Sequence, residues 1–398
     1  MKIIIVSRQY YPYGMASTNR VHCYTKGFTE LGIKTELIIP EATIPYKDKE
    51  VTQNKIAEGF YHKTYFRYMS GTTIRNKNKW KRPFLDLISR IKTICYILKK
   101  TDQKTVLYIW GGGILWSSIM ILCGHIKNAK IYTELNELPY GTTKESNKTR
   151  LFRYIMLNFI FPHYDGFIVI SEALKKLAEL YNKKTNCTLK VPILVNTNIA
   201  RDIQCIPIKT PFIFHSGTLS EQKDGIVKML IAFSIAKKEI KDLKFYFTGV
   251  LDKSKDAQII QETINKYKLK DDVKFLGYLD EKTLRSYQKS CNLMIIYKYD
   301  TLQNKYCFST KLGEYLAFEK PVILTNIGEA MYYMKNEENA FIAKWEDTNA
   351  IANYIITIIK SPELANKIGK NGLKTCEKEF NYFFHAKRMI NFFRQKID

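Results

Sequence analysis

No two cysteines in this sequence stand at C-x-x-C spacing, and none is grouped with histidines like metal ligands, although there are eight cysteines and six histidines. The patterns of zinc fingers and small disulfide scaffolds are therefore excluded. We predict free thiols in a reducing compartment. The N-terminal MKIIIVS also lacks the features of a secretion signal. We expect a cytoplasmic protein with no bound metal and no cofactor.

Long apolar runs are missing as well. A membrane-spanning helix needs about 20 consecutive apolar residues. The best run, residues 114–124, stops near half that length and contains two serines. The richer stretch 151–170 is broken by charged and polar residues. We therefore predict no transmembrane helix.

Acidic residues are scarce, because 38 Asp and Glu stand against 63 Lys and Arg, which gives a net charge of +25. Such a charge is typical of proteins that meet nucleic acid, an anionic membrane or an anionic substrate. The excess is local, since residues 47–104 hold fifteen Lys and Arg and five Asp and Glu. No nucleic-acid reader motif accompanies it, so we expect no nucleic-acid partner.

Short apolar strands alternate with helices in both halves of the 398 residues. The alternation predicts an α/β fold, with two Rossmann-like domains built on parallel sheets. Such sheets bind ligands outside the carboxyl ends of their strands, so two in tandem predict a site in a cleft between them. The predicted parts are a first domain over 1–199, a linker over 200–211, a second domain over 212–378 and a terminal helix over 379–398.

The most informative run, residues 306–323, reads YCFSTKLGEYLAFEKPVI. A loop is predicted to enter a helix near Ser309, where free backbone N–H groups suit a phosphate. Glu314, on the first turns of that helix, is placed to accept hydrogen bonds from sugar hydroxyls. The run resembles E-G-F-G-x-x-x-x-E-A-M-A-x-G-x-P-V-V of the retaining nucleotide-sugar glycosyltransferases of the GT-B fold, in particular glycosyltransferase family four. The positions that match in register are Phe308, Glu314, Ala317, Pro321 and Val322.

The run departs from the family pattern at Tyr306, which replaces the first Glu, and at Ser309, which replaces the second Gly of the loop. Some branches of the family read S-K-L-x-E-Y-L here, which residues 309–316 nearly reproduce. The resemblance implies that this run contacts the donor sugar and its phosphates. The donor-binding candidates taken from it are Tyr306, Phe308, Ser309, Lys311 and Glu314.

A second match, residues 215–225, is similar to the family's G-R-L-x-x-x-K-G. In the family, the Arg and the Lys neutralise the donor diphosphate, a leaving group whose charge needs fixed cations. Lys223 keeps its position, Thr218 replaces the Arg, and Lys311 is a candidate to compensate. Residues 273–279 resemble the strand and loop that recognise the nucleotide base. Gly217, Thr218, Lys223 and Tyr278 therefore join the donor-binding candidates.

In the first half, residues 11–21 look like the family's P-x-x-G-G-x-x-x-R loop, which meets the donor phosphates and the acceptor. Gly14, also a catalytic candidate, and Arg20 keep their positions. Residues 132–139 resemble Y-E-x-x-D-L-W-P of some bacterial members. Glu134 and Glu137 are candidates for acceptor orientation or base chemistry; the alternative is that both are caps at a strand end.

The resemblance implies a retaining, metal-independent glycosyltransferase for which a nucleotide-diphosphate-sugar is the donor. Its first domain would bind the acceptor, its second the nucleotide-sugar, and its terminal helix would pack back on the first. The expected acceptor is a glycan or a lipid-linked oligosaccharide of a surface polysaccharide. The alternative function is that of a non-catalytic binding or scaffolding subunit of a glycan assembly complex.

Within the basic segment, residues 84–100 carry apolar side chains at helical spacing. One interpretation is a helix whose apolar stripe faces the core and whose basic face is solvated. The other is a surface helix that lies on anionic lipid at the inner face of the cytoplasmic membrane, helped by the tryptophan and basic residues at 77–82.

Overall fold

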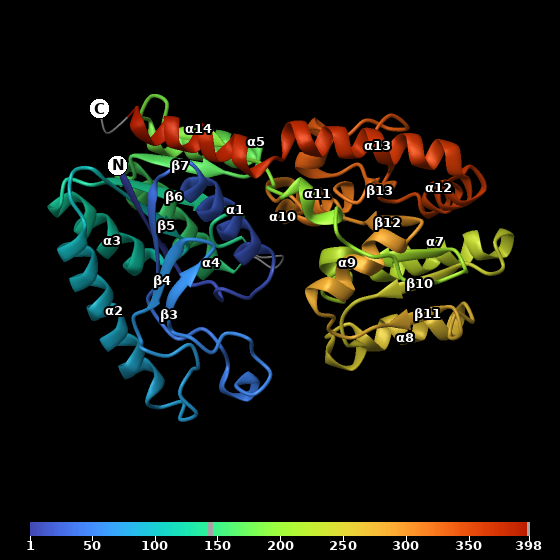
Figure 1. Ribbon diagram of the computed structural model, residues 1–398, viewed down its shortest axis with the longest axis horizontal. Helices are drawn as coiled ribbons and strands as arrows, with labels where there is room; N and C mark the ends of the chain where they lie inside the picture. Colours follow the sequence, from blue (N-terminus) through green and yellow to red (C-terminus); the bar gives the residue numbers. More distant parts are fainter. Residues whose placement is uncertain (142–145, 396–398) are drawn as a thin grey trace. The chain divides into compact units, whose positions relative to one another are not determined.

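The computed structural model describes residues 1–141 and 146–395, and the chain divides into two compact units (Figure 1). The first comprises Met1–Leu194 and the chain from Tyr382 onward, and the second is Val195–Asn381. Residues 200–211, expected to be a linker, fall within the second unit. The backbone N–H of Val195 donates to the carbonyl of Phe380, which joins the two ends of that unit.

The first unit is built on a sheet of the order β3-β4-β2-β1-β5-β6-β7-β8. All neighbouring strands in it are parallel except the β3–β4 hairpin. The strands are β1 (Lys2–Ser7), β2 (Lys34–Ile39), β3 (Glu58–Tyr61), β4 (Thr64–Tyr68), β5 (Thr105–Trp110), β6 (Lys130–Leu135), β7 (Gly166–Val169) and β8 (Thr188–Lys190). The helices are α1 (Ala16–Glu30), α2 (Arg82–Lys100), α3 (Ile114–Ile126), α4 (Asn147–Ile155), α5 (Glu172–Asn182) and α14 (Tyr382–Arg394), with short helices at Tyr46–Asp48, Met156–Ile160 and Phe161–His163.

The helix α14 completes the core of the first unit. Gly27 of α1 lets the two helices meet closely, because a Cβ there would lie 2.4 Å from the Cβ of Ala386. The ring of Phe393 packs against those of Phe28 and Tyr132. The predicted return of the terminal helix to the first domain is thus confirmed. Residues 396–398 of that predicted helix lie outside the described residues.

The second unit has a parallel sheet of the order β11-β10-β9-β12-β13-β14. Its strands are β9 (Phe212–His215), β10 (Lys244–Phe247), β11 (Val273–Phe275), β12 (Leu293–Ile296), β13 (Val322–Thr325) and β14 (Phe341–Ala343). Its helices are α6 (Glu221–Asp224), α7 (Ile226–Glu239), α8 (Ala257–Lys266), α9 (Glu281–Ser290), α10 (Leu302–Tyr306), α11 (Lys311–Leu316), α12 (Thr348–Lys360) and α13 (Pro362–Glu379), with short helices at Thr197–Ala200, Leu251–Lys253 and Gly328–Tyr332. The α/β fold class with two Rossmann-like units is confirmed.

Each sheet has one point at which the order of its strands reverses: between β1 and β5 in the first unit, and between β9 and β12 in the second. At such a point the connections leave in opposite directions, so a crevice opens at the carboxyl ends of the two strands. These two crevices are where ligands are expected.

The apolar stripe of helix α2 does not face the core in the way that the first interpretation of this segment predicts. The residues it buries are Ser89, Thr93 and Ile97, whereas Phe84 and Leu87 are exposed. Much of its apolar stripe therefore faces away from the core. In the described part of the chain, no helix combines the length and the apolar character needed to cross a membrane. None of the eight cysteines, all of which lie in the described part of the chain, forms a disulfide.

Candidate functional site

The crevice of the second unit holds a cluster of charged side chains around the buried Asp224. The ammonium of Lys311, the first residue of α11, lies 2.9 Å from Asp224 Oδ1, and that of Lys298, just after β12, lies at the same distance from the same oxygen. Asp224 is buried, while the side chains of Lys311 and Lys298 are 18% and 21% exposed. Two cations share one carboxylate, which leaves the cluster with a net positive charge at the carboxyl ends of β9 and β12.

His215, the last residue of β9, supports Lys311 from within the sheet. Its Nδ1 lies 3.1 Å from the carbonyl oxygen of Ile295, and its Nε2 lies 3.3 Å from Lys311 Nζ. The carbonyl can only accept, so Nδ1 carries the proton and Nε2 accepts from the ammonium. Burial, reinforced by the charge of Lys311, lowers the pKa of His215 to about 3. The imidazole is therefore neutral and adds no repulsion to the cluster.

The charges of the two lysines also shift the pKa of Asp224. Burial by itself would raise the pKa of Asp224, but Lys311 and Lys298 outweigh it and hold that pKa below its ordinary value. Burial lowers the pKa of Lys311, and the charge of Asp224 opposes the shift. Of the three N–H donors of Lys311, contacts to Asp224 and His215 use two. One donor remains for an anion.

Gly217 brings the backbone of the loop after β9 against this lysine. Its φ is +148°, which strains any residue with a side chain, and a Cβ added there would lie 2.6 Å from Lys311 Nζ and would displace the end of that lysine. Its N–H donates to Thr248 Oγ1 at 2.8 Å. The structure thus brings together Gly217 and Lys311, two predicted site residues more than ninety positions apart in sequence.

The other predicted donor residues lie around this pair in different ways. Thr218 and Lys223 are exposed, and the backbone carbonyl of Lys223 accepts a hydrogen bond from Lys298. The helix with Glu314 begins at Lys311 rather than near Ser309, and the Glu314 side chain is half-buried in its first turn. Ser309 is half-buried in the preceding loop.

Two aromatic candidates have opposite environments. The ring of Phe308 is buried and stacks on Tyr333 at a centroid distance of 5.5 Å, so its side chain belongs to the packing that holds the loop. Tyr278 is 79% exposed, and the ammonium of Lys253 lies 5.9 Å from its ring centroid. Tyr306 ends α10 and is half-buried.

Three residues of the cluster were missed from the sequence: His215, Asp224 and Lys298. His215 and Lys298 carry a weak signal, because each lies at the carboxyl end of a predicted strand, where ligands gather. Asp224 follows Lys223 directly and precedes Gly225, but nothing in the sequence distinguishes it from a turn residue.

The protonation of His215 makes stability depend on pH. The folded protein keeps it neutral down to about pH 3, while the unfolded chain takes up a proton near 6.5. The free energy of unfolding therefore has its full contribution from neutral His215 above pH 6.5. This contribution declines as the pH falls and is smaller by about 2 kcal/mol at pH 5. We expect the thermal unfolding midpoint to fall between about pH 7.5 and pH 5, and His215→Asn to reduce that fall. His163→Asn, at an exposed site, is the control; an equal fall in all three proteins would contradict the prediction.

In the first unit, the crevice between β1 and β5 is bordered by two glycine loops. Residues 111–113 are consecutive glycines after β5; Gly111 and Gly112 have φ of +73° and +129°. They lead into α3, so their backbone lies open beside a helix N-terminus. This loop was also missed from the sequence, although three glycines after a buried strand are a usable signal.

The loop that contains Gly14 is held at several points. The backbone N–H of Tyr11 donates to Tyr68 Oη at 3.0 Å, and that of Tyr13 donates to Asn54 Oδ1 at 2.8 Å. A Cβ on Gly14 would lie 2.0 Å from Thr18 Oγ1. Glycine is therefore needed for this loop to pass over the first turn of α1.

Arg20 and Glu134 are buried against each other. Arg20 Nε lies 2.8 Å from Glu134 Oε1, and the rest of the guanidinium donates to the carbonyls of residues 191 and 192. The hydroxyls of Tyr24 and Tyr108 donate to the same carboxylate. Burial raises the pKa of Glu134, and Arg20 opposes the shift. Both oxygens of the Glu134 carboxylate are engaged by these partners. This favours the interpretation of Glu134 as a structural residue at the end of its strand over a role in base chemistry. Glu137 is exposed after β6.

Among the described residues, no group of three or more His, Cys, Asp or Glu is arranged to hold a metal ion. The charged groups of the second crevice are instead the two lysines and the aspartate described above.

Comparison with known proteins agrees with this architecture. Residues 196–375 match the family model "Glycosyl transferases group 1". Sucrose-phosphate synthase from Thermosynechococcus elongatus is 18% identical and covers 99% of this chain and 98% of its own, with a TM-score of 0.76. HepE from Anabaena, solved with UDP, is 14% identical and covers 98% of this chain and 99% of its own, with a TM-score of 0.71. A glycosyltransferase from Rickettsia africae is 17% identical over 99% and 98%, with a TM-score of 0.71. Curated proteins give no significant match.

The whole chain has the fold of these solved structures, the GT-B fold. Residues 196–375, which lie within the second unit, match the glycosyl transferases group 1 model, and this match supports glycosyltransferase activity. The predicted resemblance and enzyme class are thereby confirmed.

Proposed function

We propose that this glycosyltransferase is retaining and metal-independent, and that it takes a sugar from a nucleotide-diphosphate-sugar. The acceptor is a hydroxyl of a glycan or a lipid-linked oligosaccharide in surface polysaccharide biosynthesis. The second unit binds the donor, and the first binds the acceptor. The observation that carries the donor assignment is the ammonium of Lys311, held by Asp224 and His215 against Gly217.

The cluster supplies what a diphosphate leaving group needs. Negative charge develops on the diphosphate as the bond to the sugar breaks, and fixed cations that stabilise this charge lower the barrier. Lys311 and Lys298 provide two such cations, which compensates for the arginine that Thr218 replaces. HepE, a structure of the same fold, was solved with UDP and with UDP-glucose, which supports a nucleotide donor.

In the proposed mechanism the acceptor hydroxyl attacks the sugar on the face from which the diphosphate leaves. The departing phosphate oxygen takes the hydroxyl proton, so no separate protein base is required. This accords with the buried, fully engaged carboxylate of Glu134. Glu314 accepts hydrogen bonds from the hydroxyls of the donor sugar, and Gly14 lets the loop after β1 approach the reacting groups.

A screen of the purified protein against UDP-, GDP-, ADP- and dTDP-sugars tests the proposal, with thermal stabilisation and nucleotide release as readouts. One donor is expected to raise the unfolding temperature and to be hydrolysed slowly without an acceptor. If the folded protein shows neither thermal stabilisation nor nucleotide release with any of these donors, the donor assignment is contradicted.

We also propose that α2 brings the enzyme to an anionic membrane surface. Trp80, Phe84, Leu87 and Ile91, here called the apolar face, are 92%, 65%, 54% and 51% exposed. The helix α3 lies beside α2 (Figure 1). Leu122 of α3 is exposed too. Basic residues at positions 77, 79, 81 and 82 flank this face. Apolar side chains next to cations are the arrangement of helices that lie in a lipid headgroup region.

We expect the protein to co-sediment with vesicles that contain anionic lipid, and less with neutral ones. Replacing the four basic residues at 77–82 by Gln is expected to weaken this binding by at least about tenfold, since each is worth about 1 kcal/mol near the surface. The control replaces four exposed lysines of the second unit, Lys266, Lys282, Lys367 and Lys370. Equal binding by both variants would rule out this membrane contact.

A further inference from the structure

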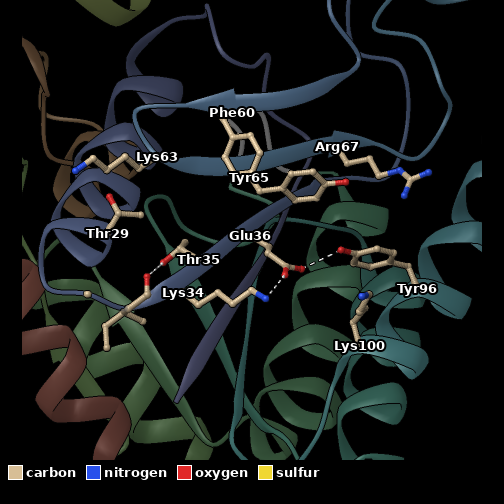
Figure 2. A pocket seen from close by; sticks show the side chains of 12 residues that line it. Thr29, Lys34, Thr35, Glu36, Phe60, Lys63, Tyr65, Arg67, Tyr96 and Lys100 are labelled. Atoms are coloured by element: carbon tan, nitrogen blue, oxygen red, sulfur yellow. Dashed lines mark hydrogen bonds and ion pairs between the residues drawn. The ribbon is translucent and has the colours of Figure 1, made fainter.

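The membrane contact uses only part of the positive charge of residues 47–104. Five other basic residues of this segment line a groove of the first unit, between the β3–β4 hairpin and α2: Lys63, Arg67, Lys92, Lys99 and Lys100. One cavity, of about 590 Å³, lies at the amino-terminal edge of the sheet (Figure 2). A second, of about 650 Å³, adjoins it, because Arg67 and Tyr96 line both.

The groove is strongly cationic. Six basic and two acidic residues line it: Lys34, Lys63, Arg67, Lys92, Lys99, Lys100, Glu36 and Glu58. Both acids are already engaged, Glu36 by Lys2 at 3.1 Å and by the Tyr96 hydroxyl at 2.9 Å, and Glu58 by Arg67 at 3.2 Å. In the described part of the chain, no ion pair involves the lysines at 63, 92, 99 and 100. The groove therefore presents uncompensated positive charge.

Aromatic rings lie among these cations. Phe60 is 75% exposed on the edge strand β3, with its ring centroid 5.6 Å from that of Tyr65. Figure 2 shows the two rings beside each other, with Lys63 to one side and Arg67 to the other. Exposed aromatic faces carry partial negative charge and attract the C–H edges of a ligand. Rings and cations together suit sugar rings that bear negative groups.

The groove is long enough for a chain. It follows β4 from Lys63, before the strand, to Gly71, beyond its carboxyl end. Along α2 it runs from Lys100 back to Ile91, about 14 Å at the rise of an α-helix. It therefore runs from the amino-terminal edge of the sheet toward the carboxyl-terminal edge, the edge at which the crevice between β1 and β5 is also expected.

We propose that this groove binds an anionic glycan chain, the part of the acceptor or product that lies away from the reacting end. Lys63 and Lys100 pair with its carboxylates or phosphates, and Phe60 stacks on a sugar ring. The inference rests on the proposed function in one respect, that the acceptor is a glycan. It adds that this glycan is negatively charged.

Fluorescence anisotropy with a labelled oligogalacturonate, a chain of uronic acids, tests the inference on the full-length protein. The wild type is expected to bind it with salt-sensitive affinity and to ignore neutral maltohexaose. Lys63→Asn with Lys100→Gln is expected to weaken binding about tenfold, because two charged contacts are lost. Asn tolerates the positive φ of 66° at residue 63. Phe60→Ala is expected to weaken binding without changing the salt dependence.

The matched control is Lys282→Gln with Lys370→Gln, which removes the same charge from exposed sites of the second unit. Equal affinity in the groove and control variants would overturn the inference. Tighter binding of an RNA oligonucleotide or of anionic vesicles that is lost in the groove variant would also overturn it, by assigning the groove to another partner. The donor-induced thermal shift, measured in parallel, separates failure here from failure of the donor assignment.

Discussion

Lys311→Met is expected to lower turnover with the active donor by about 10²- to 10³-fold, the usual cost of removing one group that stabilises transition-state charge. Lys311 is the first residue of α11, and its ammonium lies against the backbone of Gly217. Lys298 remains on Asp224, so the aspartate keeps a partner and the unit is expected to fold. The measurement is steady-state turnover together with thermal stabilisation by the nucleotide.

Two further variants make this result specific. Lys311→Arg keeps the charge and is expected to retain more activity than Met, although the wider guanidinium must fit against Gly217. Lys370→Met, at an exposed position of α13, is expected to change nothing. Full turnover in Lys311→Met would remove the lysine from the donor site and with it the main support for the proposed function.

Arg20→Met is expected to destabilise the first unit by about 3–5 kcal/mol, because it leaves Glu134 charged and buried without its partner. The side chains of Arg20 and Glu134 are 3% and 0% exposed. The measurement is urea-induced unfolding followed by a signal of the first unit. Replacing both partners, with Arg20→Met and Glu134→Leu, is expected to recover part of the loss, because the isolated charge is then gone.

A control on the same helix separates burial from charge. Lys26 pairs with Glu30 at 4.0 Å while about a third of each side chain is exposed, so Lys26→Met is expected to cost less than about 1 kcal/mol. If Arg20→Met unfolds like the wild type but loses turnover, the pair belongs to the catalytic machinery rather than to the support of the fold.

The residues of the candidate site that belong to a sequence motif could be predicted. Those that join the site only through tertiary packing could not. Gly217 and Lys311 were both named from separate runs of sequence. Their contact depends on the register between β9 and the start of α11, which no local pattern contains. Asp224 was invisible for the same reason: its role comes from two lysines that follow it by 74 and 87 residues in the chain.

The same limit explains Arg20 and Glu134. Their types and their places in the family pattern suggested contact with substrate. Only the packing of α1 on the sheet shows that the two side chains meet each other and two tyrosine hydroxyls. Likewise, helical spacing identified α2, but spacing gives the period of an apolar stripe and not the direction in which it points.

The sequence by itself determined the class of the fold and of the enzyme. Buried parallel strands need nearly continuous apolar runs, such as residues 3–6 and 106–109, and these runs are local. The tertiary structure decided which charges meet, which stay exposed and where a groove opens. Those properties depend on side chains far apart in sequence, whose pKa values, ion pairs and solvent exposure are set by the neighbours that folding brings to them.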